Sequence, residues 1–351
     1  MPLGPHAVQG SLLPRHHLSR LGAVALIMLV LASLSVVIPD RNSGRSAVHA
    51  AGSFTFTAAG DYGQTKHSTA VLQAIASAGG SFHLALGDLN YDYPNVSADQ
   101  WSSYAKGYVG SNFPFEILYG EHDTGDISQL AADLPNRMAG LSGTYPYQYY
   151  FDYPAGAPLA RILMLSPGLA PYKYDKGNAN YNWVASAIDS ARAAHIPWVI
   201  VGEHKYCIVI DSSHTNTCSG QDLMNLLLSK RVDLILQGQK HGYQASKQLA
   251  LNTTTCTSLS VASYKPSCVV GASSSPLKGA GSVITICGTG GKSLALVDAS
   301  DPEAGYFRTW MGGNANPTWG MSKITVSATQ LHLQFVAASG GTFSDSLTIH
   351  S

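Results

Sequence analysis

The 351-residue chain has few charged side chains, since Asp, Glu, Lys and Arg make up 12% of it, about half the usual share. Basic and acidic residues number 21 each, so no excess of positive charge favours nucleic acid or an anionic membrane as a partner. No Cys-x-x-Cys pair, Walker loop or dinucleotide-binding glycine motif occurs. These absences argue against a thiolate zinc site, a P-loop site and a Rossmann cofactor site.

The first 50 residues have the pattern of a targeting segment. A basic head is followed by an apolar run over residues 21–38 and then by the small residues of Val48-His49-Ala50, a cleavage site for signal peptidase. We therefore expect residues 1–50 to be a signal peptide and residues 51–351 to form the secreted domain. The alternative is an uncleaved anchor, because a run of 18 residues is at the lower limit for a membrane-spanning helix. A membrane partner is expected only in that case, with the domain at the outer face.

The cysteines fit an oxidising compartment. Cys207 and Cys218 bracket one short segment, and Cys256 and Cys268 bracket another. Local pairing is the simplest arrangement, although four cysteines allow three connectivities. Cys287 lies in an apolar run and is expected to be a buried thiol.

Five apolar runs each lead through a glycine to an acid or a histidine. The runs are residues 54–59, 82–86, 115–119, 198–201 and 232–237. Short apolar runs bounded by glycine predict buried strands. Because the carboxyl ends of the strands line the ligand crevice of an open α/β sheet, the acids and histidines that follow them predict a metal site with several ligands.

Apolar residues at helical spacing lie between these runs and predict a largely parallel sheet with helical connections. The expected helices are residues 67–78, 98–108, 178–194 and 221–231. Residues 147–153 and 161–166 are expected to be further strands, and residues 252–281 a surface insertion. Three C-terminal segments alternate apolar and polar residues, which predicts antiparallel strands that form a second sheet on the first. They are residues 321–327, 331–337 and 344–349.

In order and composition the five junctions resemble the motifs of the metallophosphoesterases, or calcineurin-like phosphoesterases. Those motifs are Gly-Asp-x-Gly, Gly-Asp-x-x-Tyr, Gly-Asn-His-Asp, a histidine after a strand, and Gly-His-x-His. Tyr91 in the second motif resembles the purple acid phosphatase branch. The resemblance implies an α/β fold, a sandwich of two mixed β-sheets flanked by helices. Glu121 stands where the family has Asn, and Gln239 where it has the first His of the last motif.

The resemblance also implies a dinuclear metal centre bridged by Asp88. The first ion would take Asp61, Asp88, Tyr91 and His241, and the second would take Asp88, Glu121, His204 and Gln239. A phenolate favours iron at the first position, although Tyr91 could instead be a packing residue. The second position has lost an imidazole and gained a carboxylate, so it should hold a divalent ion more weakly. Among Mn, Zn, Mg and Ca, its oxygen-rich ligand set suits zinc least.

The resemblance gives His122 and Asp123 catalytic roles. His122 would face the substrate and assist the leaving oxygen, and Asp123 would orient it. The expected function is an exported hydrolase that attacks small phosphate monoesters or diesters with a metal-bound hydroxide. The alternative is a catalytically weakened pseudoenzyme that binds metal or phosphate, because Glu121 and Gln239 replace family ligands.

Overall fold

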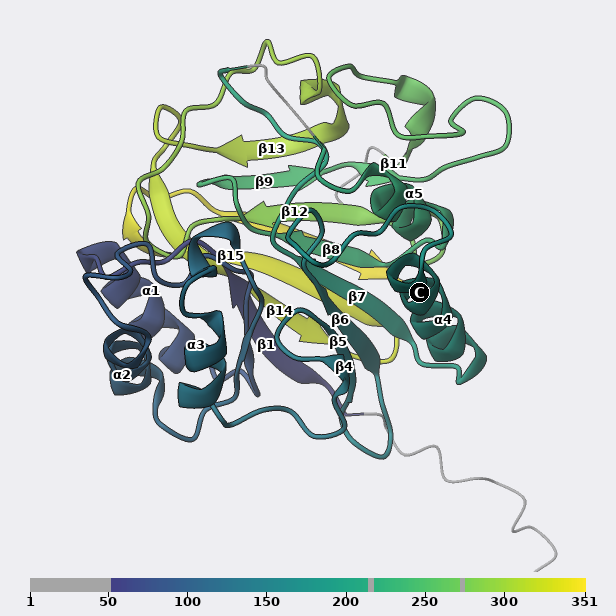
Figure 1. The fold of residues 1–351 in the computed structure, drawn as a ribbon. Helices are drawn as coiled ribbons and strands as arrows, with labels where there is room; N and C mark the ends of the chain where they lie inside the picture. The colour runs from purple at the N-terminus through teal and green to yellow at the C-terminus, as the bar shows by residue number, and fades with distance from the viewer. Residues whose placement is uncertain (1–51, 214–217, 272–274) are drawn as a thin grey trace, which may run out of the picture. The chain divides into compact units, whose positions relative to one another are not determined.

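Two mixed β-sheets lie face to face in the computed structural model of the chain, which describes residues 52–213, 218–271 and 275–351 (Figure 1). The six-stranded sheet has the order β16-β15-β14-β1-β2-β3. Its strands are β1 (Phe54–Ala59), β2 (His83–Ala85), β3 (Phe115–Ile117), β14 (Thr318–Val326), β15 (Gln330–Gly340) and β16 (Asp345–His350). The sandwich of two mixed sheets is therefore confirmed.

The eight-stranded sheet has the order β13-β9-β12-β8-β7-β6-β5-β4. Its strands are β4 (Ser142–Thr144), β5 (Gln148–Tyr153), β6 (Ala160–Leu165), β7 (Trp198–Glu203), β8 (Leu234–Gln237), β9 (Tyr243–Ser246), β12 (Val283–Cys287) and β13 (Phe307–Met311). Strands β6, β7, β8 and β12 run parallel to one another. This parallel block carries the fourth and fifth junctions at its carboxyl ends.

The helices cover the outer faces of the two sheets, with α1, α2 and α3 beside the first and α4 and α5 beside the second (Figure 1). They are α1 (Lys66–Ser77), α2 (Ala98–Val109), α3 (Ile127–Asp133), α4 (Ala179–Ala193) and α5 (Gln221–Ser229). Three of them begin at capping residues, because Thr65, Ser97 and Asn178 each accept a backbone N–H of the first turn. The four predicted helices, α1, α2, α4 and α5, are present within two residues of their expected ends.

The central strands alternate between two apolar cores. On β6, Ile162 faces the core between the sheets, whereas Leu163 faces the core beneath α4 and α5. Ile200 and Val201 of β7 divide in the same way. Because side chains point to opposite faces along a strand and both faces are covered, these strands are apolar throughout. Their burial explains the continuous apolar runs in the sequence.

The expected separate sheet of C-terminal strands is wrong. β14 pairs antiparallel with β1, with Phe54 opposite Val326, so β14, β15 and β16 extend the sheet of β1, β2 and β3. The alternating pattern identified one buried face but not the strand edge that these segments would join. The free edge of β1 needs a partner for its backbone groups, and β14 supplies it. Of the strands that lead to the five junctions, β1, β2 and β3 lie in the six-stranded sheet, and β7 and β8 lie in the eight-stranded sheet.

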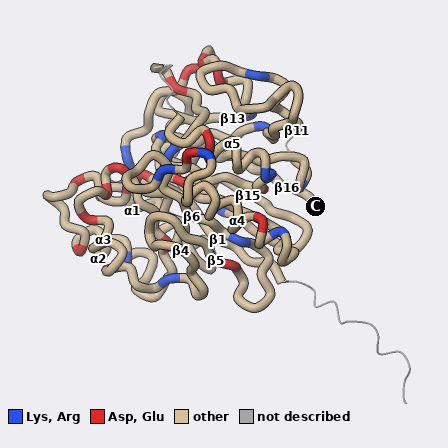
Figure 2. The backbone as a smooth tube through the Cα atoms, turned by 45° about the vertical axis from the view of Figure 1, so that its right-hand side comes forward, with Lys and Arg blue, Asp and Glu red and all other residues tan. Residues whose placement is uncertain are grey.

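Both locally paired disulfides are present, Cys207–Cys218 and Cys256–Cys268, and Cys287 is a buried free thiol, as predicted. The expected signal peptide lies outside the described residues. Within residues 52–213, 218–271 and 275–351, no helix is long and apolar enough to cross a membrane. Charged residues of both signs are scattered along the chain among many uncharged ones (Figure 2).

Candidate metal centre

The loops after β1, β2 and β8 are tied together by backbone hydrogen bonds at the edge where the two sheets meet. The Asp61 N–H donates to the Gly87 carbonyl at 3.1 Å, which joins the first junction to the second. The Gly238 N–H donates to the His204 carbonyl at 3.1 Å, which joins the fifth to the fourth. The Gly60 N–H donates to the Cys287 carbonyl at 2.9 Å and so connects the two sheets. The predicted ligands therefore gather at one place.

The four residues predicted for the first metal position surround one point. The Tyr91 hydroxyl oxygen lies 2.8 Å from Asp61 Oδ1, 2.9 Å from Asp88 Oδ2 and 2.8 Å from His241 Nε2. The other ring nitrogen of His241 lies 2.9 Å from the Ser293 carbonyl, which fixes the ring orientation as in many metal sites. Such an arrangement of two carboxylates, a phenol and an imidazole fits a hard metal ion.

At the second position, two buried atoms that could bind a metal, His204 Nε2 and Glu121 Oε2, have no aligned hydrogen-bond partner among the described residues. His204 Nδ1 donates to the Leu86 carbonyl at 2.7 Å, so the lone pair of the neutral ring is on Nε2. That Nε2 lies 2.8 Å from Glu121 Oε2 and 3.4 Å from Asp88 Oδ1, yet among the described residues it has no aligned hydrogen-bond partner, and neither does Glu121 Oε2. Buried polar atoms normally have partners, so this pair fits a shared metal ion. Asp61, Asp88 and His204 by themselves form a cluster that could hold an ion.

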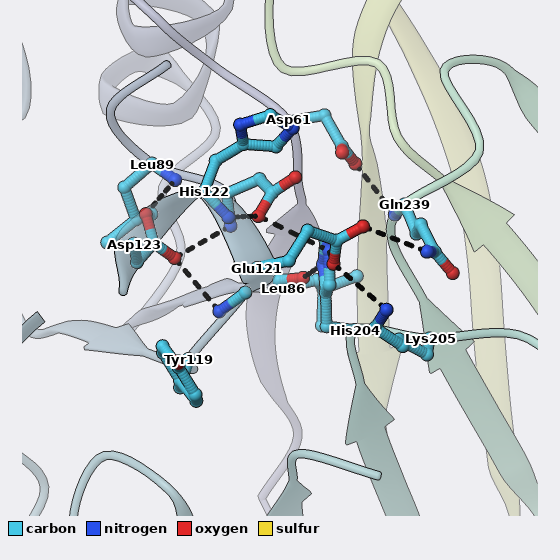
Figure 3. A network of polar contacts seen from close by, with 12 residues as sticks. Asp61, Leu86, Leu89, Tyr119, Glu121, His122, Asp123, His204, Lys205 and Gln239 are labelled. Atoms are coloured by element: carbon cyan, nitrogen blue, oxygen red, sulfur yellow. Dashed lines mark hydrogen bonds and ion pairs between the residues drawn. The ribbon is translucent and has the colours of Figure 1, made fainter. Parts of the chain in front are cut away.

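Gln239 contacts a predicted ligand of the first position through its backbone and one of the second position through its side chain. Its backbone N–H donates to Asp61 Oδ2 at 2.9 Å, and its side-chain Nε2 donates to Glu121 Oε1 at 2.9 Å (Figure 3). A metal would require the amide to turn and present its oxygen instead. The two residues that depart from the family pattern are therefore in direct contact with each other.

Three site residues have left-handed backbone conformations that non-glycine residues seldom adopt. The φ angles are 66° at Asp61, 52° at Asp88 and 63° at Gln239. Such positions concentrate at functional sites, where the surrounding structure holds them in place. Gly120 is needed for close approach, because a Cβ there would lie 2.3 Å from Asp88 Oδ1.

Two named plant phosphatases are similar to this chain in sequence. No protein-family model matches the chain. It is 25% identical over 206 residues to purple acid phosphatase 18 of Arabidopsis thaliana, an alignment that covers 56% of this chain and 45% of the relative. It is 24% identical over 220 residues to phosphoenolpyruvate phosphatase of Allium cepa, with 58% and 44% covered. In sequence and in fold the chain resembles the purple acid phosphatase-like metallophosphoesterases. It spans less than half the length of these two relatives.

Solved structures share the metallophosphoesterase fold of the chain. The purple acid phosphatase PPD1 of yellow lupin (Lupinus luteus) has a TM-score of 0.61 at 17% identity, over 86% of this chain and 54% of that one. PhoD has a TM-score of 0.52 at 15% identity, over 85% and 70% respectively. At these identities the likeness concerns the fold.

Neighbouring charged side chains in the candidate metal centre shift one another's pKa values. Burial alone would raise the pKa of Asp88, but His204 beside it holds that pKa below its ordinary value. Glu121 is likewise buried, yet His204 and Lys205 lower its pKa. Burial would lower the pKa of His204, but Asp88 and Glu121 raise it well above its ordinary value. Without a metal the imidazole therefore favours a proton, which a bound ion would displace.

The pKa of Tyr91 is raised, whereas those of the carboxyl groups of Asp88 and Glu121 are lowered. Burial, followed by the nearby carboxylates of Asp61 and Asp88, raises the pKa of its hydroxyl far above the ordinary value. The neutral hydroxyl can then donate to those carboxylates. A metal ion reverses this balance, because a coordinated cation favours the deprotonated ligand.

Asp123 does not contact His122 as we expected. Its buried carboxylate accepts the backbone N–H groups of Asp88 at 2.9 Å, Leu89 at 2.7 Å and Gly120 at 2.9 Å (Figure 3). Neighbouring residues of a 3-10 turn project about 120° apart, and Glu121–Asp123 is such a turn. The imidazole of His122 instead packs on the ring of Tyr91, with 4.4 Å between centroids. The expected orienting role of Asp123 is therefore corrected to a role in holding the loop backbone.

Two lysines lie near the candidate metal centre. Lys205 Nζ lies 3.6 Å from Glu121 Oε2. Lys292 Nζ lies 4.1 Å from the centroid of the Tyr91 ring. Lys205 directly follows the predicted ligand His204, and Lys292 follows the glycine run 288–291. Those positions are weak signals, because lysines in polar loops are usually solvated.

Proposed function

We propose that this chain is an exported, metal-dependent phosphoesterase that hydrolyses small phosphate monoesters or diesters. The observation that carries the proposal is the convergence of Asp61, Asp88 and His241 on the Tyr91 hydroxyl, each within 2.9 Å. Relatives named purple acid phosphatase and phosphoenolpyruvate phosphatase support the same reaction class. The two disulfides support an oxidising compartment outside the cytoplasm.

The proposal includes two metal positions that share Asp88. Asp61, Tyr91 and His241 would complete the first, which suits iron. Glu121, His204 and Gln239 would complete the second, which suits a divalent ion such as Mn, Mg, Ca or Zn and should be the weaker of the two. Bound ions would neutralise the phosphate charge and activate water as the nucleophile.

The chain itself would assist the reaction through His122. Its backbone N–H donates to Asp88 Oδ1 at 2.9 Å, and its exposed imidazole rests on Tyr91. The ring is therefore positioned beside the metal ligands while it remains accessible to substrate. A protonated imidazole there can give a proton to the leaving oxygen of the ester.

A catalytically weakened metal-binding protein is the second candidate. The contact between Gln239 Nε2 and Glu121 Oε1 at 2.9 Å favours this candidate. In this contact the two residues that differ from the family pattern bind each other instead of a second ion. Such a protein would bind metal or phosphate without efficient turnover.

A hydrolysis assay with metal analysis tests the proposal. The secreted domain is assayed against chromogenic phosphate monoesters and diesters, and its metals are quantified. We expect bound metal and turnover, with both absent in Asp88→Ala. Bound metal without hydrolysis of any ester would support the second candidate. Sequencing of secreted material should begin at or near Ala51, whereas intact chain found only in membranes would support the anchor.

A further inference from the structure

Glu121 contacts three other side chains at the second metal position. Its Oε2 lies 2.8 Å from His204 Nε2 and 3.6 Å from Lys205 Nζ, and its Oε1 accepts from Gln239 Nε2 at 2.9 Å (Figure 3). We propose that Lys205 and a divalent ion are alternative counter-ions of Glu121, so that Lys205 sets how tightly the second position holds its ion. This inference rests on the proposed metal centre and adds a residue that controls it.

Lys205 is held close to Glu121 rather than free in solvent. Its side chain is only 16% exposed, and that of Glu121 is 33% exposed. The stem of Lys205 passes Gly168, where an added Cβ would lie 3.5 Å from Lys205 Cδ. Partial burial reduces the screening by water, so the ammonium acts strongly on charges near Glu121.

No other lysine next to the centre takes this role in the part of the chain that the structure describes. Lys240 is paired with Asp211 at 2.7 Å, and Lys292 lies over the Tyr91 ring. His204 also touches Glu121, but its Nε2 would itself be a metal ligand. Lys205 is thus the lysine that remains beside Glu121 when the imidazole binds an ion.

The net charge of the second ligand set gives a reason for a lysine at position 205. By resemblance the family has Asn and His where this chain has Glu121 and Gln239, so this ligand set carries one extra negative charge. The ammonium of Lys205 cancels that charge at a distance of 3.6 Å. A divalent ion that binds Glu121 must approach this ammonium, and the two cations repel each other. The second position should then fill only at a high concentration of free divalent ion.

The experiment measures the affinity of the second ion directly. The secreted domain, isolated with its first ion, is titrated with Mn²⁺, and free Mn²⁺ is followed by electron paramagnetic resonance. Lys205→Gln should tighten the dissociation constant by about 10- to 100-fold, the range for changes next to metal ligands. Lys205→Arg keeps the charge and should resemble the wild type.

Lys230→Gln is the matched control, since Lys230 pairs with Asp189 at 2.6 Å and none of its described contacts is with a metal-centre residue. It should leave the Mn²⁺ affinity unchanged. The inference is overturned if Lys205→Gln binds Mn²⁺ no more tightly than the wild type, or if Lys205→Arg behaves like Lys205→Gln. If the wild type binds metal and hydrolyses esters while Lys205→Gln is unaltered, this inference alone fails. If the wild type holds no metal at all, the proposed function fails with it.

Discussion

The carboxylate of Asp123 accepts the backbone N–H of Asp88 at 2.9 Å. Its same oxygen accepts the N–H of Gly120 at 2.9 Å, and its other oxygen accepts that of Leu89. One buried side chain thus holds the loops after β2 and β3. These loops carry the bridging carboxylate and Glu121, so the spacing of the metal ligands depends on a residue that is not itself a ligand.

Replacement of Asp123 by Asn tests this dependence. The amide has a single acceptor oxygen, and its NH₂ group would face a backbone N–H. We expect the free energy of unfolding to fall by roughly 1–3 kcal/mol, the cost of a buried group left without a partner. Urea denaturation and metal analysis measure the effect, and metal content should fall as well. Asp175→Asn, at an exposed position, is the control. Unchanged stability in Asp123→Asn would show that the backbone contacts are dispensable.

Asp88 and His122 should respond differently to replacement by alanine. Asp88→Ala should lose metal and activity together, because one carboxylate serves both positions. His122→Ala should keep its metal and lower kcat by about 100- to 10,000-fold, the range for a general acid. Metal content and turnover are measured on the same samples. Loss of metal from His122→Ala would make His122 a ligand and would contradict the assignment.

The double change Glu121→Asn with Gln239→His should rebuild the ligand set of the family. It removes one negative charge and restores an imidazole, so preference should move toward zinc, iron or manganese. Metal content should approach two ions per chain, and turnover should rise. Because the side chains touch at 2.9 Å, each single change should help less and the effects should not add.

The wild type is the reference for this variant. If it already holds two ions and is as active as the double variant, Glu121 and Gln239 form a working alternative ligand set. If both proteins bind metal and neither hydrolyses an ester, the weakened protein is the correct description.

Glu116 should make stability depend on pH. Burial, partly offset by the Met138 N–H and Arg137, raises the pKa of its carboxyl from 4.5 to about 7. Below pH 4.5 both the folded and the unfolded chain hold the proton, so the contribution of this group is fully present. As pH rises toward 7 the unfolded chain releases the proton more readily, and that contribution is lost. The loss should be at most about 3 kcal/mol.

Glu116→Gln isolates this contribution, since glutamine stays neutral and can still accept from the Met138 N–H. The gap in unfolding free energy between variant and wild type should grow in favour of the variant from about pH 5 to about pH 7. Urea titrations at several pH values measure it, with Asp175→Asn as an exposed control. Parallel pH profiles for Glu116→Gln and the wild type would contradict the prediction.

Local features of the sequence were sufficient to predict four of the five α-helices, the junction strands and the resemblance to the family. Apolar spacing is a pattern of a few residues, so α1, α2, α4 and α5 could be predicted closely. The same holds for the disulfides, whose cysteines are 11 and 12 residues apart. Each predicted ligand lies in the loop that follows its strand, which is why the residue types of the centre could be recognised from their order.

Contacts between distant residues could be decided only by the tertiary structure. Tyr91 meets His241 across 150 positions, and the pairing of β14 with β1 joins the two ends of the domain. The direction of the Asp123 carboxylate depends on the turn that contains it and on the loop it faces. The approach of Lys205 to Glu121 depends on how the third and fourth junctions meet. Such contacts depend on the whole packed arrangement, because no short-range pattern encodes which side chains of separate loops will face each other.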